Sequence, residues 1–133
     1  MNWDYIAGFF DGEGNVNIIK NKVKLAHYIQ MRLYSSDEKV LLNIKNFIQK
    51  GTIYKTKKSS ATNFVYELTI SNKQDVYFFL NNIVRRIIIK KEMVDYILSN
   101  FNFGRDCNKD FNISHFRNLN QRNKGNVNNL LTE

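Results

Sequence analysis

The chain has 133 residues, with 20 Lys and Arg against 12 Asp and Glu, for a formal net charge of +8. This length fits one domain, and its 43% hydrophobic residues suffice for a packed core, which excludes a wholly disordered chain. The single cysteine, Cys107, excludes an intramolecular disulfide framework and a Cys-rich zinc module. No apolar run approaches a membrane span, and no secretory signal is evident. We therefore expect a soluble, intracellular protein without a membrane partner, and its charge favours a polyanionic one.

The composition also bears on the origin of the chain. Asn, Ile and Lys are abundant, and their codons are rich in A and T. An AT-rich genome is therefore expected, and the compartment would be a mitochondrion or chloroplast, or the cytoplasm of a bacterium that hosts a phage or carries the gene itself.

The first elements are predicted to be a helix and a β-hairpin. Residues 3–10 form an apolar helical stretch, which two nearby glycines close. Residues 22–33 alternate between apolar and polar side chains, as a half-buried strand does, and residues 15–20 are its hairpin partner across Asn21. The buried face of the longer strand is predicted to hold Val23, Leu25, His27, Ile29, Met31 and Leu33.

A capped helix and a second hairpin follow, and the pattern then repeats. Residues 35–38 have the form of a capping box that opens a helix, and residues 52–58 and 63–70 alternate as a second hairpin. Residues 71–74 are a second capping box with a helix after it, and a further helix is expected at about 88–101. The order of elements is thus α-ββ-α-ββ-α.

This order predicts an α+β domain. The two hairpins combine into one four-stranded, saddle-like antiparallel sheet with helices on a single face. We expect residues 1–103 to form the core of the domain and residues 104–133 to be a polar, basic C-terminal extension of the same domain.

The other face of the sheet is expected to be open to solvent. Amides, hydroxyls and basic groups dominate it, and these groups suit base edges and phosphates in a major groove. Any antiparallel sheet can have a polar face without a ligand, but the scarcity of acids here favours DNA. The predicted DNA-facing residues are Asn15, Asn17, Ile19, Lys22, Lys24, Tyr28, Gln30, Arg32, Thr52, Tyr54, Thr56, Lys58, Asn63, Glu67 and Thr69.

The segment that carries chemistry is Tyr5–Gly14. Its helix ends in two acids, Asp11 and Glu13, and a strand follows at once. Such a turn aims the Glu13 carboxylate and the Gly12 carbonyl out of the fold, and both are hard oxygen ligands suited to Mg²⁺. Glycine caps followed by acids also occur in proteins that bind no metal, so the segment alone leaves both readings open.

This segment resembles the motif of the LAGLIDADG homing endonucleases, in which small residues and two acids stand in the same order. The order of elements extends the resemblance over residues 3–103. Three departures occur, at Phe9–Phe10, Gly12 and Glu13, but glutamate is still a carboxylate ligand. The family pattern implies that Glu13 binds metal and that Asp11 is the more structural acid.

The resemblance also implies a lysine near the start of the last core helix. Lys90 is favoured for this position, with Lys91 as the alternative, because one sequence does not fix the register. A polar or basic residue is expected just after the second strand, where this chain has Leu33 and Tyr34. The identity of that second pocket residue stays open.

The family architecture pairs two copies of the motif helix, with the two acids side by side. This chain has one motif, so the resemblance implies a homodimer. Ala7 and Gly8 are small enough for close helix packing and, together with Asp11, are the residues expected at the dimer interface.

The function implied by the resemblance is site-specific cleavage of double-stranded DNA in intron homing. A homodimer would cut a pseudo-palindromic target and leave short 3′ overhangs, with Glu13 and Lys90 as catalytic residues and Mg²⁺ held by Glu13 and the Gly12 carbonyl. Ca²⁺ is the expected non-cleaving substitute. Two alternatives remain: an intron RNA maturase and a DNA-binding protein that has lost cleavage, although Glu13 argues against simple loss.

Overall fold

The computed structural model describes residues 1–57, 64–105 and 108–132. The predicted α-ββ-α-ββ-α order is confirmed, and two more helices follow it, of which only the first was expected. The elements are α1 (Trp3–Glu13), β1 (Gly14–Lys20), β2 (His27–Ser35), α2 (Glu38–Ile48), β3 (Thr52–Lys57), β4 (Phe64–Ile70), α3 (Lys73–Ile83), α4 (Lys91–Asn100) and α5 (Ile113–Thr132).

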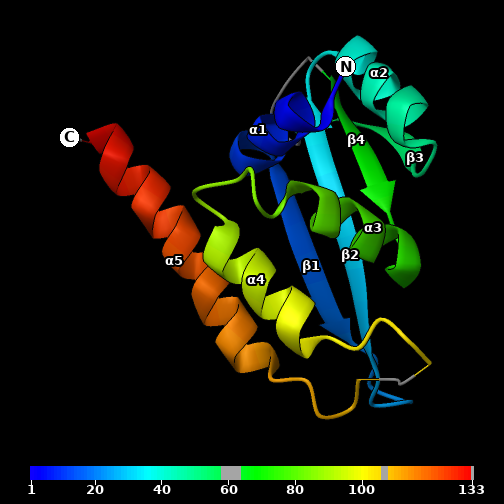
Figure 1. The fold of residues 1–133 in the computed structure, drawn as a ribbon, viewed down its shortest axis with the longest axis vertical. Coiled ribbons are helices and arrows are strands. Elements are labelled where there is room, and N and C mark those ends of the chain that lie inside the picture. The colour runs from blue at the N-terminus through cyan, green and yellow to red at the C-terminus, as the bar shows by residue number, and fades with distance from the viewer. Residues whose placement is uncertain (58–63, 106–107, 133) are drawn as a thin grey trace.

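The four strands form one antiparallel sheet in the order β1-β2-β4-β3. Strands β1 and β2 pair as one hairpin, and β3 and β4 pair as the other. In the centre of the sheet β2 pairs with β4, and Leu33 lies opposite Leu68. Helices cover one face of the sheet, and α5 runs beside α4 (Figure 1). The expected α+β architecture, with a single covered face, is confirmed.

The core lies between the helices and the covered face of the sheet. Phe10 of α1, Met31 of β2, Phe79 of α3 and Ile97 of α4 are all fully buried there. The Phe79 ring packs edge-on against the rings of Phe10 and Trp3, with centroids 5.9 and 5.8 Å apart. Aromatic contacts of this kind join α1 to α3 and hold both helices against the sheet.

Both predicted capping segments begin helices. The Asp37 side chain accepts a hydrogen bond from the backbone N–H of Lys39 at the start of α2. At the start of α3, the Asn72 side chain accepts from the backbone N–H groups of Gln74 and Asp75. Each cap satisfies donors that the first helical turn leaves without a partner.

The first hairpin has a longer loop than the sequence pattern indicates, because Asn21 closes it early. The Asn21 side chain accepts hydrogen bonds from the backbone N–H groups of Val23 and Lys24, both at 2.9 Å. The backbone N–H of Asn21 donates to the carbonyl of Ala26 at 2.7 Å. Strand β2 therefore begins at His27 rather than at residue 22.

This loop makes part of the predicted alternation wrong. Val23 is 92% exposed, and Leu25 is 52% exposed with a φ of 57°, so neither lies on the buried face. Lys22 and Lys24 lie in the same exposed loop and not on the strand face where they were predicted. Beyond the loop the prediction is confirmed, since the remaining inward residues His27, Ile29, Met31 and Leu33 are all buried.

The start of α4 differs from the prediction, and part of the second hairpin lies outside the described residues. Helix α4 begins at Lys91 rather than at residue 88, because other contacts hold the preceding residues, as shown below. Strand β3 ends at Lys57 and β4 begins at Phe64. The predicted DNA contacts Lys58 and Asn63 lie outside the described residues.

The segment after residue 104 contains the helix that the sequence analysis missed. Phe116 and Leu119 of α5 are 2% exposed, and they belong to the same core as the other helices. Phe111, just before α5, packs against the His27 ring, and Nδ1 of His27 donates to the Asn108 carbonyl at 2.5 Å. Although α5 has 20 residues, no helix in the described ranges is both long and apolar enough to cross a membrane.

The central position of Phe79 gives a stability prediction. Phe79→Ala removes a fully buried ring and leaves a cavity, so the free energy of unfolding should fall by about 3–5 kcal/mol. Phe78→Ala is the matched control, because its ring is 40% exposed and should cost clearly less. Urea unfolding followed by circular dichroism measures both, and equal losses would contradict this description of the core.

Candidate active site

The junction between α1 and β1 is sharp because residue 14 is glycine. A Cβ at Gly14 would meet the Phe10 ring at 2.5 Å and a Leu33 methyl group at 2.9 Å, distances that no real side chain keeps. The Gly14 N–H also bonds to the Phe10 carbonyl and closes the helix. Strand β1 can therefore start directly after Glu13, and this close turn leaves Glu13 and Gly12 exposed at the helix end.

Asp11, one turn earlier, binds a distant part of the backbone. Its Oδ2 accepts hydrogen bonds from the N–H groups of Ile88 and Ile89 at 2.9 and 3.0 Å, and its Oδ1 accepts from that of Lys90 at 2.9 Å. Hydrogen bonds to a carboxylate are stronger than neutral ones. Asp11 thus fixes the segment before α4 against the end of α1, which agrees with the structural role expected for this acid.

Lys90 lies beside the same helix end. Its Nζ donates to the Phe10 carbonyl at 3.1 Å and to the Gly14 carbonyl, and it lies 5.5 Å from the centroid of the Phe10 ring. Lys91 is exposed and does not line the pocket described next. Of the two lysines left open by the sequence, Lys90 is the one that the fold brings to Glu13.

These residues line a cavity of about 390 Å³. Residues from four parts of the chain meet there: the end of α1, the neighbouring ends of β1 and β2, the segment before α4, and α5. The lining residues are Asp11, Gly12, Glu13, Gly14, Asn15, Tyr34, Ile89, Lys90, Asn120 and Asn123.

The donor set of this cavity fits a hard divalent cation. Within the described ranges, no three His, Cys, Asp or Glu side chains gather as a complete metal site. The Glu13 carboxylate is exposed, and a helix end adds backbone carbonyls beside it. Mg²⁺ is commonly held by one or two carboxylates together with substrate phosphates and water, so one carboxylate per chain is compatible with it.

The small residues of α1 lie on opposite sides of the helix. Ala7 was expected at the dimer interface. It is instead 0% exposed and belongs, with Ile6 and Phe10, to the core of its own chain. Gly8 is exposed, and a Cβ there would have open space within 4 Å, as it would at Gly12. The exposed side of α1 therefore carries the two glycines.

The open face of the sheet holds most of the predicted DNA-facing residues. Directly opposite residues share a face, and the register pairs Asn15 with Arg32 and Asn17 with Gln30. The described residues of the predicted set on the strands are all exposed or half-buried except Thr69, which is 8% exposed. They are Asn15, Asn17, Ile19, Tyr28, Gln30, Arg32, Thr52, Tyr54, Thr56, Glu67 and Thr69.

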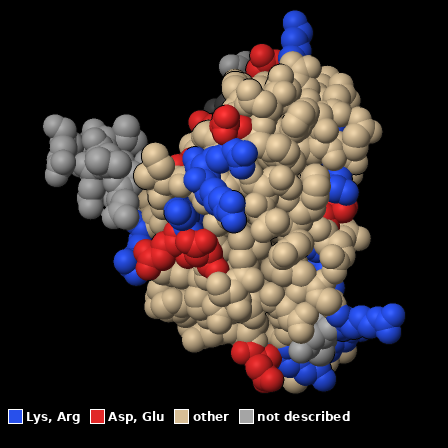
Figure 2. Space-filling model, viewed as in Figure 1, with Lys and Arg blue, Asp and Glu red and all other residues tan. Residues whose placement is uncertain are grey.

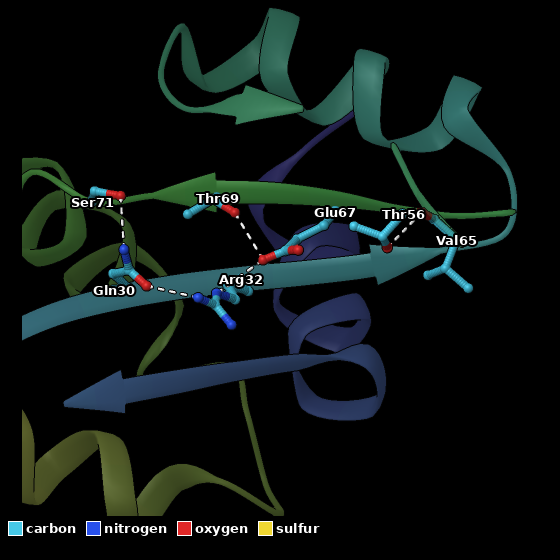
Figure 3. A network of polar contacts seen from close by, with 7 residues as sticks. All are labelled: Gln30, Arg32, Thr56, Val65, Glu67, Thr69 and Ser71. Carbon is cyan, nitrogen blue, oxygen red and sulfur yellow. Dashed lines mark hydrogen bonds and ion pairs between the residues drawn. The ribbon is translucent and has the colours of Figure 1, made fainter. Parts of the chain in front are cut away.

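A chain of polar contacts fixes the middle of this face (Figure 3). Arg32 pairs with Glu67 at 2.9 Å, and its Nη2 donates to the Gln30 side chain at 2.9 Å. Gln30 donates to the Ser71 hydroxyl at 3.3 Å, and the Thr69 hydroxyl donates to Glu67 at 3.0 Å. Glu67, an acid on the face predicted to bind DNA, thus orients Arg32 and offsets part of its charge.

Charge is distributed unevenly over one face of the molecule. On the face shown in Figure 2, most of the surface is uncharged, and the basic and acidic side chains gather in a few groups. Among the described ion pairs, Arg86 in the turn after α3 binds Asp4 of α1 at 2.7 Å, and Arg122 of α5 binds Glu92 of α4 at 3.5 Å. Because such exposed pairs add little stability, the excess of lysine and arginine matters mainly for partners.

Of the lining residues, Asn120 and Asn123 were missed from the sequence, and Tyr34 is one of the two residues at the pocket position left open there. Tyr34 stands directly after the inward-facing Leu33, and the alternation that placed Leu33 in the core could have assigned it to the other face. Asn120 and Asn123 come from α5, whose helical signal was the three-residue spacing of Ile113, Phe116 and Leu119.

The geometry defines an α+β protein with an acidic helix end and a basic side chain at the edge of an open antiparallel sheet. The family model described as LAGLIDADG endonuclease matches residues 6–100, well over half of the chain. The chain belongs to the LAGLIDADG endonuclease family. No curated protein sequence matches it significantly.

Solved homing endonuclease structures share the fold. I-CvuI, in complex with its target and Ca, aligns with a TM-score of 0.59 at 18% identity, over 73% of this chain and 63% of that one. The archaeal I-Vdi141I, complexed with DNA, gives 0.58 at 24% identity over 73% and 64%. I-AabMI, bound to uncleaved DNA, gives 0.60 at 19% identity over 74% and 35%. The aligned part thus spans less than two thirds of each relative.

The Asp11 contact can be tested through stability. Asp11→Ala leaves three backbone N–H groups without their acceptor, so the free energy of unfolding should fall by about 1–3 kcal/mol. Asp95→Ala removes an exposed carboxylate from α4 and should change it by less than about 0.5 kcal/mol. Chemical denaturation compares the two, and an Asp11→Ala protein as stable as the control would show that the contact is unimportant.

Proposed function

We propose that this chain is a site-specific endonuclease for double-stranded DNA, which acts as a homodimer with Mg²⁺. The observation that carries the proposal is the exposed Glu13 at the end of α1, in one cavity with Lys90 and at the start of the open sheet face. A carboxylate and a lysine placed together beside a surface for DNA are what metal-dependent phosphodiester hydrolysis needs.

The homodimer follows from the incomplete site. One chain supplies one carboxylate to the cavity apart from Asp11, whose two oxygens already bind backbone N–H groups. Pairing two α1 helices through their glycine-bearing sides would bring two Glu13 side chains together. The alignments support this, since this fold covers 63% of I-CvuI but only 35% of I-AabMI, which is thus long enough for two such units.

In the proposed mechanism, Glu13 and the Gly12 carbonyl hold the metal at the scissile phosphate. Mg²⁺, when bound, offsets the negative charge that builds on the phosphate and activates water. Lys90 would meet the same charge from beside Glu13, because its Nζ is held by the Phe10 and Gly14 carbonyls at the same helix end. Two cuts close to the dimer axis would leave short 3′ overhangs.

DNA binding would use the open face of the sheet. Its amide, hydroxyl and arginine side chains suit base edges, and the net charge of +8 per chain suits phosphates. I-CvuI and I-Vdi141I were both solved with DNA, and I-CvuI with Ca as well as with Mg, where its DNA was not cleaved. We extend DNA recognition to this chain, and Ca²⁺ as its non-cleaving substitute stays a prediction.

The first test separates cleavage from binding. The wild-type protein selects its target from a plasmid library with a randomised segment, and the selected duplex then serves for all variants. Glu13→Gln keeps the shape of the side chain but removes the charge that holds the cation, so cleavage in Mg²⁺ should fall by at least about 100-fold. Gel-shift affinity in Ca²⁺ should change little, because it rests on many phosphate contacts.

Glu38→Gln is the matched control for this test, since it removes an exposed carboxylate from the first turn of α2, which does not line the cavity. It should cleave as the wild type does. Near-normal cleavage by Glu13→Gln would refute the mechanism, and a wild type that cleaves no member of the library would refute the function.

The second test concerns the dimer. A leucine at residue 8 would meet open space within its own chain and is a better helix former than glycine, so a Gly8→Leu chain should fold. It would nevertheless block the close approach of a second α1. Sedimentation should therefore show a folded monomer, whereas Asn43→Leu on the exposed side of α2 should stay dimeric. A dimeric Gly8→Leu protein would place the interface elsewhere.

A further inference from the structure

Helix α5 contributes a buried amide to the candidate active site. Asn123 lines the cavity together with Glu13 and Lys90, yet it is only 6% exposed. Its Nδ2 has no hydrogen-bond partner among the described residues. The segment that carries it looked like a polar extension in the sequence, and none of the roles proposed above uses it.

A buried amide without a hydrogen-bond partner lowers the stability of the fold. A buried N–H without an acceptor loses its bonds to water and gains nothing in return. The two neighbours of Asn123 on the inner side of α5, Phe116 and Leu119, are apolar and pack in the core. An apolar residue at position 123 would continue this apolar side of the helix. The polar side chain found there instead indicates a ligand atom that it can bind.

A second unpartnered atom in the same cavity is complementary to the first. Asn15 Oδ1 is buried, lines the cavity and also has no partner among the described residues. The cavity therefore offers one free donor, on α5, and one free acceptor, at the start of β1. Phosphodiester hydrolysis supplies a partner for each: a phosphate oxygen that can accept a hydrogen bond, and a water that can donate one.

We propose that Asn123 is a further catalytic residue, which donates from Nδ2 to a non-bridging oxygen of the scissile phosphate, while Asn15 Oδ1 accepts from the attacking water. This inference rests on the proposed function. In the reaction, the water oxygen bonds to phosphorus as the bond from phosphorus to O3′ breaks. The water releases one proton to solvent, and O3′ takes one up, which leaves a 3′-hydroxyl and a 5′-phosphate.

The amide complements the lysine rather than duplicating it. Lys90 brings a full charge but is partly engaged by the Phe10 and Gly14 carbonyls, whereas Asn123 brings a neutral donor from α5. A buried donor that is already in place stabilises a developing oxyanion without having to reorganise during the reaction. Asn123 should therefore affect the rate of cleavage more than the binding of DNA.

The test uses the full-length protein and the duplex that the wild type has selected. Asn123→Ala should slow single-turnover cleavage in Mg²⁺ at saturating protein by about 10- to 100-fold. Affinity for the same duplex in Ca²⁺ should stay within about two-fold, because most of it comes from phosphate contacts elsewhere. The melting temperature should change little, since alanine is the better helix former and Nδ2 of Asn123 has no described partner to lose.

Asn118→Ala is the matched control, an exposed asparagine on the same helix that does not line the cavity. It should cleave at the wild-type rate. A second readout, nitrogen-15 NMR, is independent of turnover. The side-chain amide signal of Asn123 is assigned as the one missing from the spectrum of Asn123→Ala. In the wild type, this signal should shift when the duplex is added in Ca²⁺, whereas the signal of Asn118 should not.

The outcomes are distinguishable. A wild type that cleaves, with an Asn123→Ala variant equally fast or an amide signal that ignores DNA, overturns the role of Asn123 and leaves the proposed function intact. A lower melting temperature with an unchanged rate assigns Asn123 a structural role and overturns the inference as well. A wild type that cleaves nothing overturns both proposals.

Discussion

The architecture of the cavity depends on one carboxylate that binds three successive backbone N–H groups. Asp11 lies near the end of the first helix, and its partners Ile88, Ile89 and Lys90 lie 77 to 79 residues further along the chain. A negative charge at the start of a helix is favourable, and α4 begins directly after this contact. Lys90, α4 and, through its packing on α4, α5 all take their places relative to Glu13 from this anchor.

The sheet contributes the second constraint, because its two faces have separate tasks. One face is filled by residues such as Met31 and Leu68, both fully buried, and it ties the strands to the helices. The other face is organised by side chains that bind each other, with Arg32 held between Gln30 and Glu67. A surface whose arginine is already oriented loses less conformational entropy when it meets a ligand.

Much of the fold could be predicted because the relevant signals are local. Alternation separated Ile29 and Met31 from Tyr28 and Gln30, since a strand with one buried face repeats every two residues. The same signal failed at Leu25, because a single side chain, that of Asn21, ended the pairing before the apolar pattern ended. Hydrophobic periodicity does not reveal where a loop closes.

The candidate site was predictable only in part, for the same physical reason. Glu13 belongs to a contiguous motif, so its place at a helix end followed from neighbouring residues. The choice between Lys90 and Lys91 depends on a contact with Asp11 that spans most of the chain. The amides of α5 were missed, because a helix rich in asparagine has weak intrinsic propensity and its signal is limited to a few apolar residues that pack in the core.

The distribution of the cavity along the chain has a consequence for biosynthesis. Its first wall, at residues 11–15, leaves the ribosome early, whereas Asn123 emerges more than a hundred residues later. At typical translation speeds of about 5–20 residues per second, several seconds separate the two events. A nascent chain therefore carries its acidic helix end for some time without the wall that encloses it. If the cavity is catalytic, a chain acquires its complete lining only after the synthesis of α5.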